Sequence, residues 1–74
     1  MLNKDQRYVL DELKIIFETE GKETIEFNRR DLIKRFSEID APIVIKSLVM
    51  SGYLNIEHLP KGKILVTLNN KNMI

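Results

Sequence analysis

The sequence predicts one small α+β domain in which three helices are combined with a three-stranded antiparallel sheet. Three observations lead to this prediction. The chain has 74 residues, which is enough for one domain and too few for two. Apolar residues recur at helical spacing as far as Gly52 and alternate with polar residues after it. Isolated glycines and prolines separate these segments, at positions where helices end and chains turn.

The first predicted helix covers residues 4–19 and is followed by a short strand. Asn3 stands where it can cap this helix, and Gly21 stands where the helix is expected to end. Residues 24–27 alternate and include β-favouring types, so they are predicted to form the strand. The helix carries one apolar stripe, formed by Val9, Leu13, Ile16 and Phe17.

The second helix is predicted over residues 28–37 and the third over residues 41–51. Asn28 marks the start of the second helix, because a capping residue followed three positions later by an acidic residue is a helix start signal. Asp40 is expected to cap the third helix, and Gly52 is expected to end it.

A β-hairpin is predicted over residues 53–69. Apolar and polar residues alternate on both sides of residues 60–62, whose proline and glycine are typical of a turn. The hairpin is expected to pair with the strand at 24–27, which completes the three-stranded sheet. The predicted core consists of Val9, Leu13, Ile16, Phe17, Ile25, Phe27, Leu32, Phe36, Val44, Ile45, Leu48, Leu54, Ile56, Val66 and Leu68.

Two motifs in the middle of the chain resemble a known family. The first runs from Phe27 to Phe36 (FNRRDLIKRF), and the second runs from Ala41 to Leu54 (APIVIKSLVMSGYL). The second motif ends in a leucine, three residues, a glycine and an apolar pair. Together they resemble the winged helix-turn-helix family of small single-domain transcriptional regulators, and the similarity extends over nearly the whole chain. The resemblance implies a winged-helix fold whose wing is the hairpin and whose third helix enters the major groove of DNA. Some winged helices serve instead as protein-interaction modules.

The charge of the chain is unevenly distributed. The net charge is only +1, but residues 1–20 sum to −2, residues 21–40 to 0 and residues 41–74 to +3. The positive potential is therefore expected in the C-terminal part, which can face phosphate while the first helix faces away.

Phosphate contacts are expected from the second helix and from the tip of the hairpin. The second helix has four cations within seven residues near its N-terminus, and two lysines flank Gly62. For the second helix, the alternative is an ordinary solvated face in which Asp31 pairs with Arg35. For the hairpin tip, the alternative is that the two lysines protect an exposed hairpin from aggregation. The predicted DNA-binding residues are Arg29, Arg30, Lys34, Lys46, Ser47, Lys61 and Lys63. We expect Arg30, Lys34, Lys46, Lys61 and Lys63 to lie exposed on one continuous face.

The third helix carries two kinds of group on its outward side. Lys46 and Ser47 can reach phosphate or a base edge, while Ile43 and Met50 can meet thymine methyl groups. The alternatives are a solvent-exposed face that contacts nothing and an apolar patch that docks another protein.

A second apolar strip on the first helix is formed by Tyr8 and Ile15, which lie seven residues apart. This strip can pack against the tail of its own chain, at Met73 and Ile74, or it can form a two-fold dimer interface with them. We expect a homodimer, since regulators of this size need one to bind paired half-sites.

Nothing in the sequence supports catalysis, so we expect a binding protein and not an enzyme. The chain has no cysteine, and His58 is its single histidine, so neither a protein-built metal site nor a cofactor is expected. Charged residues interrupt every apolar run, so no signal peptide or membrane span is expected. The protein is therefore predicted to lie in the cytoplasm, and on the nucleoid when it is bound to DNA.

The first hypothesis is a dimeric DNA-binding transcriptional regulator. The alternative is a module that docks a protein through Ile43 and Met50.

Overall fold

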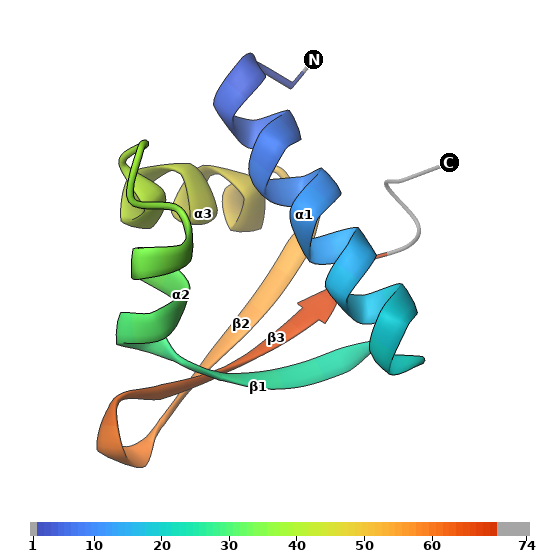
Figure 1. The fold of residues 1–74 in the computed structure, drawn as a ribbon, viewed down its shortest axis with the longest axis vertical. Helices are drawn as coiled ribbons and strands as arrows, with labels where there is room; N and C mark the ends of the chain where they lie inside the picture. The colour runs from blue at the N-terminus through green and yellow to red at the C-terminus, as the bar shows by residue number, and fades with distance from the viewer. Residues whose placement is uncertain (1, 70–74) are drawn as a thin grey trace.

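The computed structural model describes residues 2–69 and has the predicted α+β architecture of three helices and a three-stranded antiparallel sheet (Figure 1). The helices gather on one side of the sheet, and the hairpin extends away from them. In chain order the elements are α1 (Lys4–Glu20), β1 (Thr24–Asn28), α2 (Arg29–Arg35), α3 (Ala41–Met50), β2 (Leu54–Leu59), the 3-10 turn η1 (Pro60–Gly62) and β3 (Lys63–Leu68).

Both ends of α1 are fixed by local hydrogen bonds. The side chain of Asn3 accepts from the backbone N–H of Gln6, and the side chain of Gln6 accepts from the backbone N–H of Asn3, each at 2.8 Å. This reciprocal pair satisfies two backbone donors that a helix N-terminus leaves free. At the other end Gly21 adopts a left-handed conformation (φ 66°), which glycine reaches without steric cost.

The starts of α2 and α3 differ in how they are capped. The side chain of Asn28 accepts from the backbone N–H groups of Arg30 and Asp31, at 3.0 and 3.3 Å, which confirms the predicted cap. Asp40 occupies the equivalent position before α3, but its side chain makes no capping hydrogen bond, so that prediction is wrong. Pro42 at the second helical position has no N–H to offer, and the ψ of Asp40 (79°) departs from the extended values of Asn3 (178°) and Asn28 (124°), which do cap their helices.

The end of α2 is shorter than predicted. The helix stops at Arg35, while the prediction extended it to Ser37. Phe36 has non-helical dihedral angles (φ −112°, ψ 42°), and its N–H donates to the carbonyl of Ile33, which is only three residues back. Its side chain is buried. The chain therefore leaves the helix at the residue whose ring enters the core.

The sheet has β3 in its centre, with the strand order β1-β3-β2. The register places Phe27 of β1 opposite Ile64, and Ile56 of β2 opposite Val66. These side chains lie on the face that the helices cover, and Ile64 and Val66 are buried. Because successive strand residues point to opposite faces, the residues between them lie on the outer face of the sheet.

The core lies between the three helices and the inner face of the sheet. Ten of the fifteen predicted core residues are buried; the other five, Ile16, Ile25, Phe27, Ile56 and Leu68, are half-buried and pack against them. Three residues outside the prediction are also buried: Leu10, Ala41 and Ile64. Leu10 is buried because the core covers a wider sector of α1 than its predicted stripe.

Candidate nucleic-acid interface

Four of the predicted DNA-binding residues surround an open hollow between α2 and the hairpin tip. They are Arg29, Arg30, Lys34 and Lys61. The register of the sheet explains why they meet. Asn28, the last residue of β1, pairs with Lys63, the first residue of β3, so the preceding turn lies beside the first turn of α2. We call this the tip hollow.

A second hollow lies between α2, α3 and the hairpin, and we call it the helix groove. Its volume is about 320 Å³. Arg29, Lys46 and His58 supply its polar groups. The apolar residues that line it are Leu32, Ile33, Pro42, Ile45, Val49, Ile56 and Ile64. Arg29 and Ile33 also line the tip hollow, so the two hollows adjoin each other.

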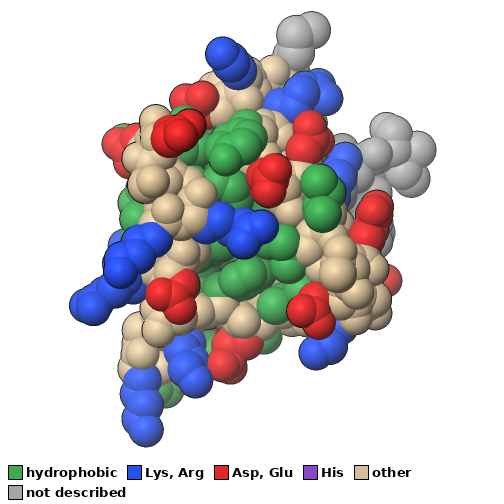
Figure 2. All heavy atoms as spheres, viewed as in Figure 1, with side chains coloured by type: hydrophobic (Ala, Val, Ile, Leu, Met, Phe, Trp, Pro, Cys, Tyr) green, Lys and Arg blue, Asp and Glu red, His purple; other side chains and the backbone are tan. Residues whose placement is uncertain are grey.

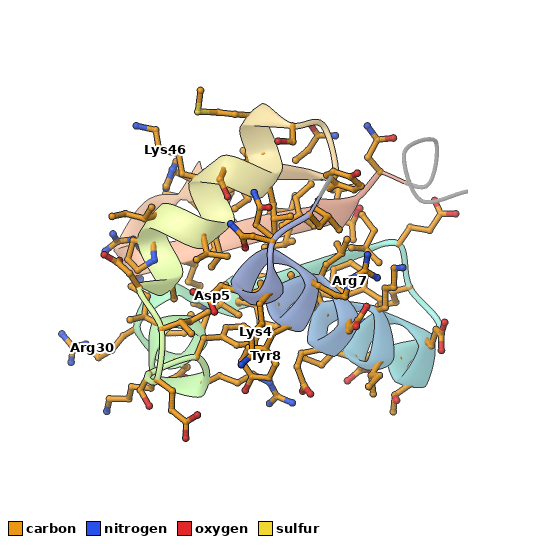
Figure 3. All side chains as sticks on the ribbon, turned by 90° about the horizontal axis from the view of Figure 1, so that it is seen from above. Lys4, Asp5, Arg7, Tyr8, Arg30 and Lys46 are labelled. Carbon is orange, nitrogen blue, oxygen red and sulfur yellow. The ribbon has the colours of Figure 1, made fainter. Side chains whose placement is uncertain are left out.

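The two hollows together define a basic face, formed by Arg29, Arg30, Lys34, Lys46 and Lys61. All five side chains are exposed. Figure 3 shows Arg30 of α2 and Lys46 of α3 extending from the body toward the same side. Figure 2 shows Lys and Arg side chains gathered at the lower left, where α2 and the hairpin tip lie.

The basic face is strongly polarised compared with the rest of the molecule. Among the described residues that line the two hollows, Asp31 is the one carboxylate, so the local charge is +4. Residues 2–69 as a whole contain eleven Lys and Arg and eleven Asp and Glu, so their net charge is zero. The fold therefore concentrates positive charge on this face, which the low net charge of the chain does not reveal.

Lys63 does not belong to the basic face, which corrects the expectation that it would join the other cations. It lies on the outer face of the sheet, and its ammonium pairs with the carboxylate of Glu26 at 3.4 Å. The cause is strand alternation: its neighbour Ile64 is buried, so Lys63 must point to the other side. The same alternation was visible in the sequence and could have excluded this residue.

Ser47 does not lie on the outward side of α3, so this prediction is also wrong. Its hydroxyl accepts a hydrogen bond from Nε2 of Gln6 at 2.9 Å and donates to the carbonyl of Val44 at 2.6 Å. At 100° per residue, position 47 lies only about 40° round the helix from Ile43, at the edge of the outward side, and that edge is half-buried where Gln6 of α1 meets it. The hydroxyl therefore joins α1 to α3. Since Gln6 lies 41 residues away, no local pattern in the sequence indicates this partner.

Arg35 also differs from its expected pairing. Its guanidinium lies 3.7 Å from the carboxylate of Glu12 on α1, and it does not pair with Asp31 in its own helix. Both side chains of the observed pair remain partly exposed to solvent, so the interaction contributes little stability. Its consequence is that Asp31 has no ion-pair partner among the described residues and lies at the edge of the tip hollow.

The outward side of α3 carries a strip made of Ile43, Lys46 and Met50, which we call the outer strip. Ile43 is 65% exposed and Met50 is 78% exposed, and each lies about one helical turn from Lys46. Pro42 and Val49 adjoin the strip where it borders the helix groove. The strip is therefore apolar apart from one ammonium group.

The hairpin tip holds one residue in an unusual backbone conformation. Lys61 has a φ of 64°, the one positive φ at a non-glycine residue in the described part of the chain. This left-handed region suits glycine and asparagine better than lysine. The conformation belongs to the turn that places Lys61 at the tip hollow.

The predicted dimer interface is exposed where the structure describes it. Tyr8 is 42% exposed and Ile15 is 58% exposed, both on α1. The ring of Tyr8 also meets the ring of Phe36 edge-on, with centroids 5.6 Å apart. Met73 and Ile74, which complete the predicted interface, lie outside the described residues.

These elements define the class of fold. A helix-turn-helix formed by α2 and α3, followed by an antiparallel hairpin that pairs with β1, is a winged helix-turn-helix arrangement. Within residues 2–69, no helix has the length and apolar character needed to cross a bilayer, and no three acidic or histidine side chains form a metal-binding group.

Comparisons with models of protein families, with curated proteins and with solved structures found no match to this chain.

Proposed function

We propose that this protein binds double-stranded DNA through the basic face, as a small dimeric transcriptional regulator. The observation that carries the proposal is the meeting of five exposed cations from α2, α3 and the hairpin tip around two adjoining hollows. Phosphate contacts by Lys and Arg supply most of the affinity of such proteins for DNA. A face of charge +4 on a chain with no net charge over residues 2–69 suits that role.

The arrangement of the elements suits a duplex. An α-helix with its side chains is about 10–12 Å in diameter, and the major groove is about 12 Å wide, so α3 fits into it. With the outer strip in the groove, Arg30 and Lys34 of α2 reach phosphates on one side of α3. Lys61 at the hairpin tip extends the same contact surface.

The proposal is tested by the salt dependence of DNA binding. A labelled duplex of random sequence is titrated with the protein, and fluorescence anisotropy is measured over a series of salt concentrations. Four phosphate contacts, by Arg29, Arg30, Lys34 and Lys61, predict that the logarithm of the affinity falls against the logarithm of salt with a slope of about −3.6. Absence of binding to any duplex at low salt would contradict the proposal.

The outer strip supports a second candidate function, the docking of a protein partner. Ile43 and Met50 are the most exposed large hydrophobic side chains in the described part of the chain. Replacing both with serine separates the two functions. If the protein binds DNA, non-specific DNA binding persists in this variant. If the protein docks a partner, partner binding is lost, and alanine at Arg30 and Lys34 has little effect on it.

Replacing Lys61 with asparagine should lower DNA affinity while leaving the domain at least as stable. Asparagine tolerates the left-handed conformation better, so the free energy of unfolding should stay equal or rise by up to about 1 kcal/mol. One lost phosphate contact should weaken binding about tenfold at 50 mM salt. Urea denaturation and anisotropy measure the two effects. The control is Lys61→Arg, which keeps the charge, and unchanged affinity in Lys61→Asn would remove Lys61 from the DNA surface.

Replacing Ile15 with glutamate should convert a dimer into monomers. Ile15 is exposed on α1, and a carboxylate buried in a symmetric interface would face its own copy. Sedimentation equilibrium at micromolar concentrations measures the mass. Ile43→Glu is the matched control, because it makes the same change at an exposed isoleucine on α3 and should leave the dimer intact. A wild-type chain that sediments as a monomer would contradict this prediction.

A further inference from the structure

The chemistry of the outer strip limits what α3 can recognise. The helix contains no arginine, asparagine, glutamine or acidic residue. The one hydroxyl, that of Ser47, is turned toward α1 and already bonded to Gln6 and to the carbonyl of Val44. The strip therefore offers the apolar side chains of Ile43 and Met50 and the single ammonium of Lys46.

Base edges in the major groove offer few groups that match such a strip. Each base pair shows hydrogen-bond donors and acceptors there, and only thymine adds an apolar group, its C5-methyl. An isoleucine or methionine side chain can discriminate bases only through that methyl group. Lys46 can donate to guanine O6 and N7 or to thymine O4.

The spacing along the strip sets the spacing of the contacts. Ile43 and Met50 are seven residues apart, which is about 10 Å along the helix axis. This distance corresponds to about three base-pair steps of B-form DNA. The other four cations of the basic face, Arg29, Arg30, Lys34 and Lys61, line the adjoining hollows, so they can hold the strip against the groove through phosphate contacts.

We propose that α3 selects DNA by contacting thymine methyl groups, with Ile43 and Met50 as its two methyl-binding residues and Lys46 between them. This inference rests on the proposed DNA-binding function and adds the chemical class of the preferred site. That site contains two thymines about three base pairs apart that flank a hydrogen-bond acceptor. Each methyl group buried contributes about fourfold in affinity, so two contribute about fifteenfold.

The test removes the methyl group and nothing else from the base edge. Affinity is measured by anisotropy at a fixed salt concentration for a thymine-rich duplex of about twenty base pairs and for the same duplex with deoxyuridine at every thymine. The thymine duplex is expected to bind about fifteenfold more tightly. A second pair of G·C duplexes contains either cytosine or 5-methylcytosine. The methyl group of 5-methylcytosine occupies the same place in the major groove as that of thymine, so the methylated duplex should bind more tightly than the unmethylated one.

Variants assign the effect to α3. Ile43→Ala and Met50→Ala should each reduce the thymine preference to about fourfold, and the double variant should abolish it. These residues are exposed, so the variants are expected to fold. Leu65→Ala, which shortens an apolar side chain on the outer face of the sheet, away from α3 and from the predicted dimer interface, should leave the preference unchanged.

Each contrary outcome has a separate meaning. Equal affinity for the thymine and deoxyuridine duplexes, with salt-dependent binding retained, would overturn the methyl contacts and leave the proposed function intact. A thymine preference that survives the double variant would overturn the assignment to Ile43 and Met50. Failure of the wild-type chain to bind any duplex would overturn both proposals and favour docking of a protein partner on this strip.

Discussion

Replacing Arg30 and Lys34 together with alanine should weaken binding to every DNA sequence by about a hundredfold at 50 mM salt. Each phosphate contact releases condensed counterions, which is worth about tenfold in affinity at that salt concentration. Both side chains line the tip hollow and are exposed. The slope of affinity against salt should become about two units less steep, because two contacts are lost. Anisotropy titrations over a salt series measure both effects.

The matched control replaces Lys4 and Lys22 with alanine. These lysines are exposed and line neither the tip hollow nor the helix groove, and the change in net charge is the same. Figure 3 shows Lys4 on α1, apart from Arg30 and Lys46. The control should retain most of the affinity. An equal loss in both double variants would mean that overall charge, and not the basic face, determines binding.

Replacing Leu48 with alanine should lower the free energy of unfolding by roughly 2–5 kcal/mol. Leu48 lies in α3 with a fully buried side chain, 0% exposed, at the centre of the core between helices and sheet. A domain of this size has a small reserve of stability, so the loss should lower the melting temperature by about 10 °C or more. The measurement is urea denaturation, in which the midpoint should fall while the slope stays unchanged.

Met50→Ala serves as the control for the stability experiment. Met50 lies two residues further along the same helix and is largely exposed, so its truncation should change the free energy of unfolding by less than about 0.5 kcal/mol. If Leu48→Ala were as stable as Met50→Ala, the packing of α3 against the sheet would differ from the structure described above.

The local features of the fold could be predicted because neighbouring residues determine them. Asn3 and Asn28 cap helices through bonds to backbone groups two or three residues away, and Gly21 ends α1 through its own dihedral angles. The alternation of apolar residues fixed the two strands of the hairpin. Asp40 stands at the equivalent position before α3 but makes no capping bond, and its ψ of 79° differs from the extended values of Asn3 and Asn28.

The candidate site could be predicted only in part. The sequence context predicts the cations of α2 and Lys61, and the helical periodicity of α3 predicts the outward positions of Ile43 and Met50. Their assembly into one face depends on the register between β1 and β3, which brings the hairpin tip to the first turn of α2. That register joins residues about 35 positions apart, so no short window of sequence contains it.

What the sequence by itself determined was the set of elements, their order and most of the core, because helical and strand periodicity are short-range properties of the chain. What only the tertiary structure decided was the set of partners for polar side chains. The sequence predicts that Ser47 contacts DNA, whereas its hydroxyl is bonded to Gln6, and Arg35 pairs with Glu12 and not with Asp31 in its own helix. A polar side chain forms a hydrogen bond with a partner group that lies within about 3 Å. Which group lies there is decided only when the helices and the sheet pack together.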